Sequence, residues 1–164
     1  MSRATTDLCD EHPEAQVCDA GFTAFGGRPG FSGTIRTLKV FEDNTLVRDA
    51  VGQPGEGRVL VVDGGGSLRC ALLGGNLAVA AAENGWAGVV VNGAVRDADE
   101  IDAQPIGVRA LGTHPRRSVK GLHSGQAGLP VVFAGVVFRE GEWLCADRDG
   151  IVVLPAAPAE GVSG

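Results

Sequence analysis

The sequence predicts an α/β protein built on a layered sheet with mixed strand directions. Apolar runs of roughly four to nine residues, bounded by glycine, proline or acidic residues, recur along the chain and are typical of buried strands. Short helical patterns separate several of these runs. The last runs follow one another without a helical pattern between them, which argues against a regular doubly wound sheet.

Strands and short helices alternate in the first half of the chain. Glycines and Pro29 make residues 21–33 a loop, because both residue types interrupt regular structure. The run RVLVVD is apolar and β-branched, as expected of a buried strand, and GGGS then turns the chain. In order, we expect a helix at 6–11, the loop at 21–33, a strand from Thr34 (TIRTLKV), a helix at 44–51, a strand at 58–63 and a short strand at 70–73.

The second half continues this pattern and then becomes strand-rich. The alanine-rich LAVAAAEN predicts a helix that Gly85 ends. We expect a helix at 77–84, a strand at 87–92, a short helix from about Asp97, and strands at 106–111, 130–138, 143–146 and 151–154. A chain of 164 residues suffices for one core, so residues 1–164 are expected to form a single domain, with 155–164 as a flexible tail.

Charge and cysteine content exclude several classes of protein. The net charge of −6 provides no global positive field for a nucleic-acid backbone or an anionic membrane, so a small anionic substrate would need a local positive site. The four cysteines form no CxxC pair, and the chain has no secretory segment or long apolar span. We therefore expect free thiols and a cytoplasmic protein without nucleic-acid or membrane partners.

Two glycine-rich turns are candidate ligand sites. GGGS at 64–67 follows a strand but lacks the helix and the later acidic residue of a dinucleotide fingerprint, so a strand-to-strand turn is the better interpretation. The turn of Gly74, Gly75, Asn76 and Leu77 leads directly into a helix, whose first N–H groups could bind a carboxylate or phosphate. Alternatively, Asn76 is only an N-cap.

The segment GAVRDADEID, at 93–102, places one guanidinium among four carboxylates directly after a buried strand. On a helix starting near Asp97, Asp97 and Glu100 would share one face, while Asp99 and Asp102 would share another. These carboxylates could bind a metal, or they could simply complement the helix dipole. Arg96 could bind a carboxylate at the exit of its strand, or it could only neutralise its acidic neighbours.

Other catalytic classes have little support. The three histidines lack zinc-binding spacing, and no GxSxG nucleophile elbow is present. Lys39 and Lys120 are the only lysines, one in an expected strand and one beside a glycine-rich loop, so a Schiff-base mechanism has few candidates. Chemistry on a carbonyl would more readily use a metal.

The run from VVDGGGS to GAVRDADEID resembles the family of the regulator of ribonuclease activity A, which also contains metal-dependent 4-hydroxy-4-methyl-2-oxoglutarate aldolases. Its diagnostic pattern is a glycine, twenty residues, Arg-Asp, two residues and an acid, and Gly75, Arg96, Asp97 and Glu100 match it. IDAQPIGVRALGTHPRRS and WLCADRDGIVVLP extend the resemblance over roughly residues 4–156.

The resemblance implies an αββα sandwich of the swivelling-domain, or phosphohistidine-domain-like, type with mixed sheets. It also implies a homotrimer with sites between subunits. In the aldolases the substrate lies against the glycine turn, here Gly74, Gly75, Asn76 and Leu77, and against Arg96, while Asp97 anchors Mg²⁺ or Mn²⁺.

These roles are chemically consistent. Mg²⁺ accepts one or two carboxylates together with water and substrate oxygens, and a 2-oxo acid supplies a carboxylate and a keto oxygen. Cleavage of a 4-hydroxy-2-oxo acid and decarboxylation of oxaloacetate both form pyruvate enolate, which the metal and Arg96 would stabilise. The base for the C4 hydroxyl would be a water polarised by Glu100 or by a carboxylate of the adjacent subunit, although Glu100 could instead hold Arg96.

A regulator of RNA processing is the principal alternative, because other members of the family bind ribonuclease E and inhibit it. The intact set of Gly75, Arg96, Asp97 and Glu100 favours the aldolase. An older name for the family, a menaquinone-pathway methyltransferase, is less favoured because no adenosylmethionine-binding loop is visible.

Overall fold

The computed structural model describes residues 3–121 and 125–159. Its helices are α1 (Thr5–Glu11), α2 (Thr45–Val51), α3 (Gly75–Glu83) and α4 (Ala98–Asp102). Its strands are β1 (Gln16–Val17), β2 (Thr23–Phe25), β3 (Phe31–Lys39), β4 (Val59–Asp63), β5 (Ala71–Leu73), β6 (Gly88–Val95), β7 (Gly107–Thr113), β8 (Gln126–Ala127), β9 (Val131–Phe133), β10 (Val136–Phe138), β11 (Trp143–Asp147) and β12 (Gly150–Leu154). The expected mixed α/β class is confirmed.

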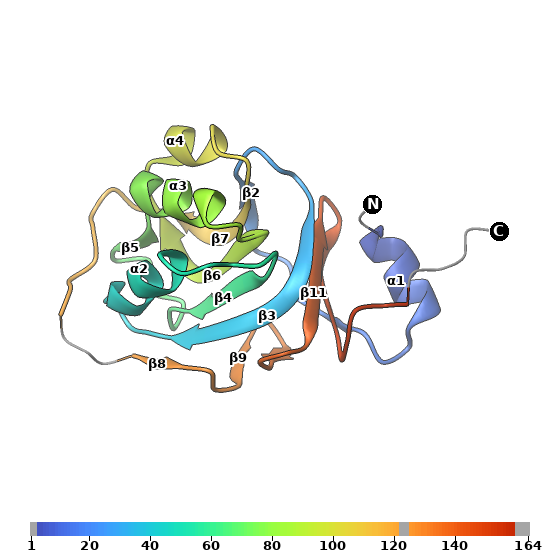
Figure 1. Cartoon of the computed structure of the whole chain (residues 1–164). Helices are drawn as coiled ribbons and strands as arrows, with labels where there is room; N and C mark the ends of the chain where they lie inside the picture. The colour runs from blue at the N-terminus through green and yellow to red at the C-terminus, as the bar shows by residue number, and fades with distance from the viewer. Residues whose placement is uncertain (1–2, 122–124, 160–164) are drawn as a thin grey trace.

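A single curled sheet of ten strands organises the molecule (Figure 1). Its order is β1-β12-β11-β3-β4-β6-β7-β2, with β5 beside β6 and β8 beside β3. The central strands β3, β4, β6 and β7 are parallel, whereas β11, β12, β1 and β2 join antiparallel. Every residue of β4 is buried, as its unbroken VLVVD sequence predicts for a strand covered on both faces.

Side-chain alternation in the central strands builds two cores, one on each face of the sheet. Leu60, Val62 and Val91 face the core shared with α2, α3 and α4. Val61 and Val90, one residue out of phase, face the core shared with β9, β10, β11 and β12. Helices α2, α3 and α4 therefore cover one face of the central strands, and strands β9–β12 cover the other. Strand β3 curves so that it pairs with both β4 and β11 (Figure 1).

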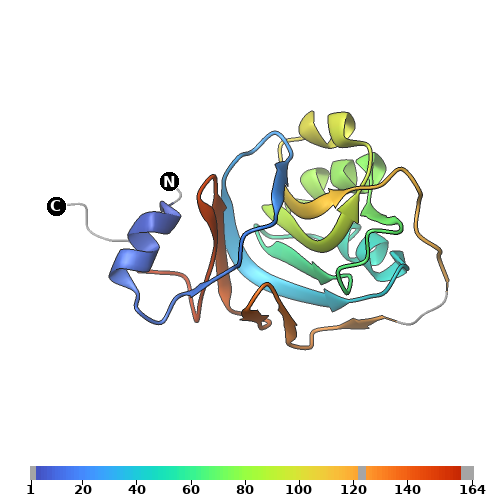
Figure 2. The same cartoon turned by 180° about the vertical axis from the view of Figure 1, so that it is seen from behind.

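Helix α1 covers the outer face of β11 and β12. Leu8 packs there with Trp143, Cys145, Val152 and Leu154 in a third, smaller core. Views from the front and from behind both place α1 on the far side of β11 from the other helices (Figures 1 and 2).

The expected loop at 21–33 is wrong in part, because it contains β2 and the start of β3. Strand β2 is a partly exposed edge strand paired with β7, and its Thr-Ala-Phe sequence carries little apolar signal. Strand β3 begins at Phe31, whose ring is buried against Gly88 and Gly107, a cross-strand pair of β6 and β7. A Cβ at either glycine would collide with that ring. The two glycines therefore make room for the ring of Phe31, and pairing with β11 makes residues 31–33 part of β3.

The expected strand at 130–138 is also wrong, because it is the hairpin of β9 and β10. Ala134 and Gly135 both have positive φ, 51° and 74°, as a two-residue hairpin turn of type I′ requires. Of the expected tail, residues 155–159 form no helix or strand, and 160–164 lie outside the described residues. Within the described part of the chain, no helix is both long and apolar enough to cross a membrane.

Candidate functional site

Two turns predicted to carry ligand chemistry lie side by side. Strand β5 pairs in parallel with the end of β6, so that Leu73 lies opposite Val95. The backbone N–H of Arg96 donates to the carbonyl of Leu73 over 2.9 Å. The glycine turn that follows β5 and the Arg-Asp pair that follows β6 therefore emerge together.

Asp97 links these two turns through its side chain. Its Oδ2 accepts a hydrogen bond from the backbone N–H of Gly75, at 3.0 Å, at the first residue of α3. The expected helix near Asp97 begins at Ala98, so that Asp97 is its N-cap residue and not part of the helix. Asp97 precedes α4 in the left-handed conformation (φ 58°, ψ 47°), which aspartate tolerates better than most residues. The carboxylates of Asp97 and Glu100 both lie against Gly75, at the start of α3.

The glycines allow this approach because they lack a Cβ. A Cβ on Gly74 would lie 3.0 Å from Asp97 Oδ2 and 3.4 Å from Arg96 Nε. A Cβ on Gly75 would collide with the carboxylate of Glu100, which therefore lies against the start of α3. The alternative in which Asn76 caps α3 is wrong, since Gly74 is the N-cap residue and Asn76 is an exposed residue of the helix.

A cavity of about 340 Å³ opens beside these turns. Its lining consists of Asn44, Arg48, Ala71, Gly74, Gly75, Asn76, Leu77, Arg96, Asp97, Arg117 and Lys120. Every predicted substrate or metal residue thus lines one cavity. Glu100, the other predicted catalytic residue, is not part of this lining and lies behind Gly75.

Three cations in the lining were not predicted as site residues: Arg48, Arg117 and Lys120. Arg48 comes from α2, and the other two come from the loop after β7. Backbone hydrogen bonds from Val119 to the carbonyl of Glu42 (3.1 Å) and from Gly121 to Thr45 Oγ1 (3.0 Å) hold this loop against the start of α2. The dense charge of RRSVK in an acidic chain was the available signal.

The cavity is strongly cationic although the chain is acidic. Four cationic side chains and a single carboxylate line it, and none of the ion pairs among the described residues involves any of them. The alternative in which Arg96 only neutralises the neighbouring carboxylates therefore has no ion pair to support it. The helix also contributes donors, because the first-turn N–H groups of Asn76 and Leu77 have no acceptor within α3. The lining suits a ligand with several anionic oxygens.

The other predicted carboxylate cluster does not form a metal site. Asp102 Oδ1 accepts a hydrogen bond from the backbone of Gly26, at 2.8 Å, which fixes β2 against α4. No group of three or more His, Cys, Asp or Glu side chains within residues 3–121 and 125–159 could hold a metal. Asp97 alone offers a carboxylate to the cavity, which fits only an ion that takes most of its ligands from water and substrate, as Mg²⁺ does.

The GGGS turn is used as a turn. It connects β4 to β5, and Asp63 Oδ1 accepts hydrogen bonds from Gly65 N (2.9 Å) and Asn92 Nδ2 (3.0 Å). The expected strand-to-strand role of these glycines is confirmed.

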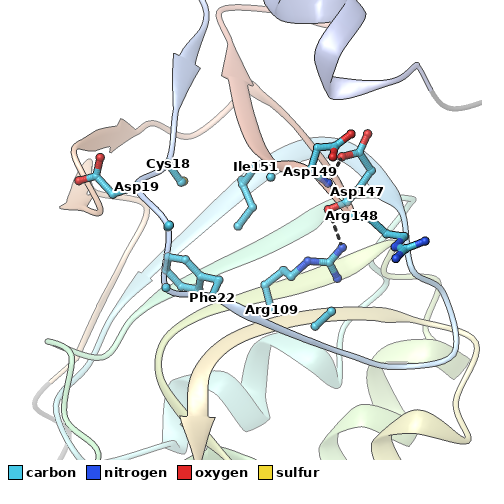
Figure 3. A pocket seen from close by; sticks show the side chains of 12 residues that line it. Cys18, Asp19, Phe22, Arg109, Asp147, Arg148, Asp149 and Ile151 are labelled. Atoms are coloured by element: carbon cyan, nitrogen blue, oxygen red, sulfur yellow. Dashed lines mark hydrogen bonds between the residues drawn. The ribbon is translucent and has the colours of Figure 1, made fainter.

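A second cavity, of about 260 Å³, lies between the segment before β2 and the turn joining β11 to β12 (Figure 3). Arg109 is part of its lining, is only 4% exposed as a residue, and donates through its guanidinium to the carbonyls of Val108, Pro29 and Asp147. Burial lowers the pKa of Arg109. Its guanidinium joins β7 to two loops, and its Cζ lies over the ring of Phe31, 5.2 Å from the ring centroid. Because Asp19 and Asp149 also line this cavity, it lacks the cationic character of the first.

The chain is similar to known proteins over nearly its whole length. A curated protein of Alkalilimnicola ehrlichii, provisionally named a 4-hydroxy-4-methyl-2-oxoglutarate aldolase, is 56% identical over 155 residues, which cover 93% of this chain and 95% of that protein. The structure of the RNA-processing inhibitor RraA from Thermus thermophilis is 51% identical with a TM-score of 0.95, covering 100% of this chain and 99% of that one.

A structure described as an S-adenosylmethionine:2-dimethylmenaquinone methyltransferase, from Geobacillus kaustophilus HTA426, is 48% identical with a TM-score of 0.91, over 94% of this chain and 96% of that one. A model of the RraA-like family, described as Aldolase/RraA, matches residues 5–153. The chain therefore belongs to the RraA-like family.

Proposed function

We propose that this protein is a lyase that cleaves 4-hydroxy-4-methyl-2-oxoglutarate and related 4-hydroxy-2-oxo acids to pyruvate, with oxaloacetate decarboxylation as a second activity. The observation that carries this proposal is the convergence of Arg96 and Asp97 on the start of α3 within one cationic cavity. The name of the Alkalilimnicola relative supports the substrate class.

The cavity cations account for substrate binding. The substrate carries two carboxylates, and the guanidinium of Arg96 would bind the one next to the keto group bidentately. Arg48, Arg117 and Lys120 would bind the second carboxylate across the cavity. The free N–H groups of Asn76 and Leu77 would complete the contacts to the anionic oxygens.

The proposed reaction develops negative charge on the keto oxygen of the substrate, which Arg96 would face. When the bond between C3 and C4 breaks, its electron pair becomes an enolate with negative charge on the keto oxygen, while the C4 hydroxyl loses its proton and becomes a carbonyl. Arg96 would stabilise the developing oxyanion, and protonation of C3 then gives pyruvate. Loss of carbon dioxide from oxaloacetate forms the same enolate, so the same residues serve both reactions.

Asp97 would hold a divalent cation, Mg²⁺ or Mn²⁺, which supplies Lewis-acid stabilisation of the keto oxygen when bound. Glu100 lies behind Gly75 and would act as the base for the C4 hydroxyl through a water molecule, unless a carboxylate of the adjacent subunit does so. No ion pair joins Glu100 to Arg96 among the described residues, so a role in holding Arg96 has less support.

A coupled assay of pyruvate release tests the function. We expect turnover of 4-hydroxy-4-methyl-2-oxoglutarate and of oxaloacetate with Mg²⁺, and none with EDTA. Arg96→Ala and Asp97→Ala should each lower kcat/KM about a hundredfold or more, the scale of losing one charge-stabilising group. In the same assay Glu100→Gln should lower kcat with little change in KM if Glu100 is part of the base.

Arg36→Ala and Asp99→Ala serve as matched controls, because both side chains carry the same charges as the tested ones but do not line the cavity. Their kinetic constants should stay within about twofold of the wild-type values. Equal losses in the controls and the cavity variants, or turnover that EDTA leaves intact, would contradict the proposal.

A regulator of RNA processing is the second candidate, favoured by the likeness to the Thermus RNA-processing inhibitor. Saturable binding to ribonuclease E, with inhibition of RNA cleavage, would support it. The methyltransferase name of the Geobacillus relative predicts binding of S-adenosylmethionine, which calorimetry can measure directly.

Four broader properties remain proposals drawn from the family resemblance and the sequence. They are a swivelling-domain type of αββα sandwich, a single domain spanning the whole chain, a homotrimer whose subunits share each site, and a cytoplasmic location. The layering of α2–α4, the two groups of strands and α1 supports the first. Four free cysteines support the last.

A further inference from the structure

One residue of the cationic cavity has an unexplained polar atom. Asn44 lies at the start of α2, lines the cavity and is only 9% exposed. Its side-chain oxygen, Oδ1, is buried and has no hydrogen-bond partner among the described residues. Buried acceptors of this kind are nearly always paired in native proteins, so an unpaired one in a cavity wall points to a missing donor.

The rest of the residue is firmly held. Asn44 Nδ2 donates to the carbonyl of Leu72 (3.3 Å), its backbone N–H donates to Ser118 Oγ (3.2 Å), and its carbonyl accepts from the N–H of Arg48 (3.0 Å). Exchanging the two amide atoms would set Oδ1 against the carbonyl of Leu72, oxygen to oxygen, which is unfavourable. The unpaired atom is therefore the oxygen, and it keeps its place.

The cavity otherwise presents donors. Its cations and the first-turn N–H groups of α3 satisfy the anionic oxygens of a ligand, whereas a hydroxyl group must also find an acceptor. The side-chain acceptors of the lining are Asn44, Asn76 and Asp97. Asp97 Oδ2 already accepts from Gly75, and Asn76 is exposed. Asn44 is thus the buried neutral acceptor of the site.

We propose that Asn44 Oδ1 accepts a hydrogen bond from a hydroxyl group of the ligand and so selects hydroxylated 2-oxo diacids over those without a hydroxyl. Identifying that group as the C4 hydroxyl of the substrate rests on the function proposed above. The amide oxygen takes no proton, so Asn44 binds and orients the hydroxyl and is not the base. Because Oδ1 is covered in the free protein, side chains of the lining must move for a hydroxyl to reach it, and Arg48 and Lys120 are exposed and long enough to do so.

Kinetics on two substrates test this inference. For Asn44→Ala, kcat/KM for 4-hydroxy-4-methyl-2-oxoglutarate should fall about ten- to a hundredfold, because a site built around a hydroxyl loses its partner. For oxaloacetate, which has no such hydroxyl, the fall should stay below about threefold. Asn44→Leu fills a similar volume without an acceptor and should behave like Asn44→Ala.

Two control variants separate selection from structural support. Asn84→Ala removes a similar amide-to-carbonyl bond, from Nδ2 to Val51 over 2.8 Å, outside the cavity. Ser118→Ala removes one tether of Asn44 but leaves Oδ1 in place. Both should leave the ratio of the two kcat/KM values unchanged. An equal fall for both substrates in Asn44→Ala and Asn44→Leu would mean a structural role and would overturn the inference.

Calorimetry distinguishes this inference from the proposed function. If the wild type cleaves neither acid, the lyase proposal fails, and binding of 4-hydroxy-2-oxoglutarate and 2-oxoglutarate then decides the role of Asn44. The wild type should bind the hydroxylated acid about tenfold more tightly, which is the effect of one hydrogen bond, and Asn44→Leu should lose that preference. Equal affinity of the wild type for the two acids would overturn the inference.

Discussion

At the scale of single residues, the sequence predicts which side chains meet but not how they meet. Gly75, Arg96 and Asp97 are found together as expected. Their arrangement depends on the left-handed backbone of Asp97, which no helical periodicity can predict. Asn44 and Arg48 belong to the same cavity through contacts between segments distant in sequence, and such contacts leave no local pattern, whereas the dense charge of RRSVK marks Arg117 and Lys120.

Gly75→Ala tests the close approach of the Glu100 side chain to Gly75. The new Cβ would collide with the Glu100 side chain, which must swing away from the start of α3. Alanine favours the helix by about 1 kcal/mol over glycine, which offsets the cost of moving Glu100, so the free energy of unfolding should change little. Pyruvate release should nevertheless fall at least about tenfold, because Glu100 is displaced. The measurement combines thermal unfolding with the coupled assay.

Gly112→Ala is the matched control, because a Cβ at Gly112 has no atom within 4 Å and that glycine does not have a positive φ. Its activity should match the wild type. Unimpaired turnover in Gly75→Ala would show that Glu100 can leave α3 without consequence for the reaction.

At the scale of elements, strong local patterns are predicted and long-range anchors are not. The apolar β4 and the alanine-rich α3 lie within two residues of their predicted bounds, whereas β6 continues to Val95, three residues beyond its predicted end at Asn92. The sequence predicts one strand in place of the hairpin of β9 and β10, because VVFAGVVF is apolar throughout and gives no sign that Ala134 takes a positive φ in the turn. Helix α1 was expected, but its attachment to Asp147 spans 142 positions and lies beyond any local signal.

The attachment of α1 predicts a pH-dependent stability. Burial raises the pKa of Asp147, but hydrogen bonds from Thr5, Asp149 and Gly150 outweigh it and leave the pKa below its ordinary value of 3.8. The stabilisation is therefore complete above that value and is lost as the pH falls through the lower pKa of the folded state. Asp147→Asn should lower the free energy of unfolding at pH 7 by about 2 kcal/mol, and by progressively less below about pH 4.

Denaturant unfolding at pH 7 and at about pH 3 measures this difference. Asp149→Asn is the control, because the Asp149 side chain is exposed two positions away, and it should be neutral at both values. If Asp147→Asn lowers the free energy of unfolding by the same amount at both pH values, the charge of Asp147 contributes nothing to the docking of α1.

At the scale of the whole molecule, the main finding is a cationic cavity in an acidic protein. The net charge of −6 indicates that an anionic ligand needs a local positive site, and the fold creates one by bringing together α2, the end of β6 and the loop after β7. The mixed α/β class follows from strand lengths and short helices alone. The curl of the sheet does not, because it depends on how β3 pairs with both β4 and β11.

Diffraction from crystals soaked with Mn²⁺ and pyruvate tests the central claim most directly. We expect an anomalous peak for Mn²⁺ beside the carboxylate of Asp97, with pyruvate between that ion and the guanidinium of Arg96, in the cavity at the start of α3. An ion bound elsewhere, or pyruvate outside this cavity, would contradict the claim that Arg96 and Asp97 act together on one substrate.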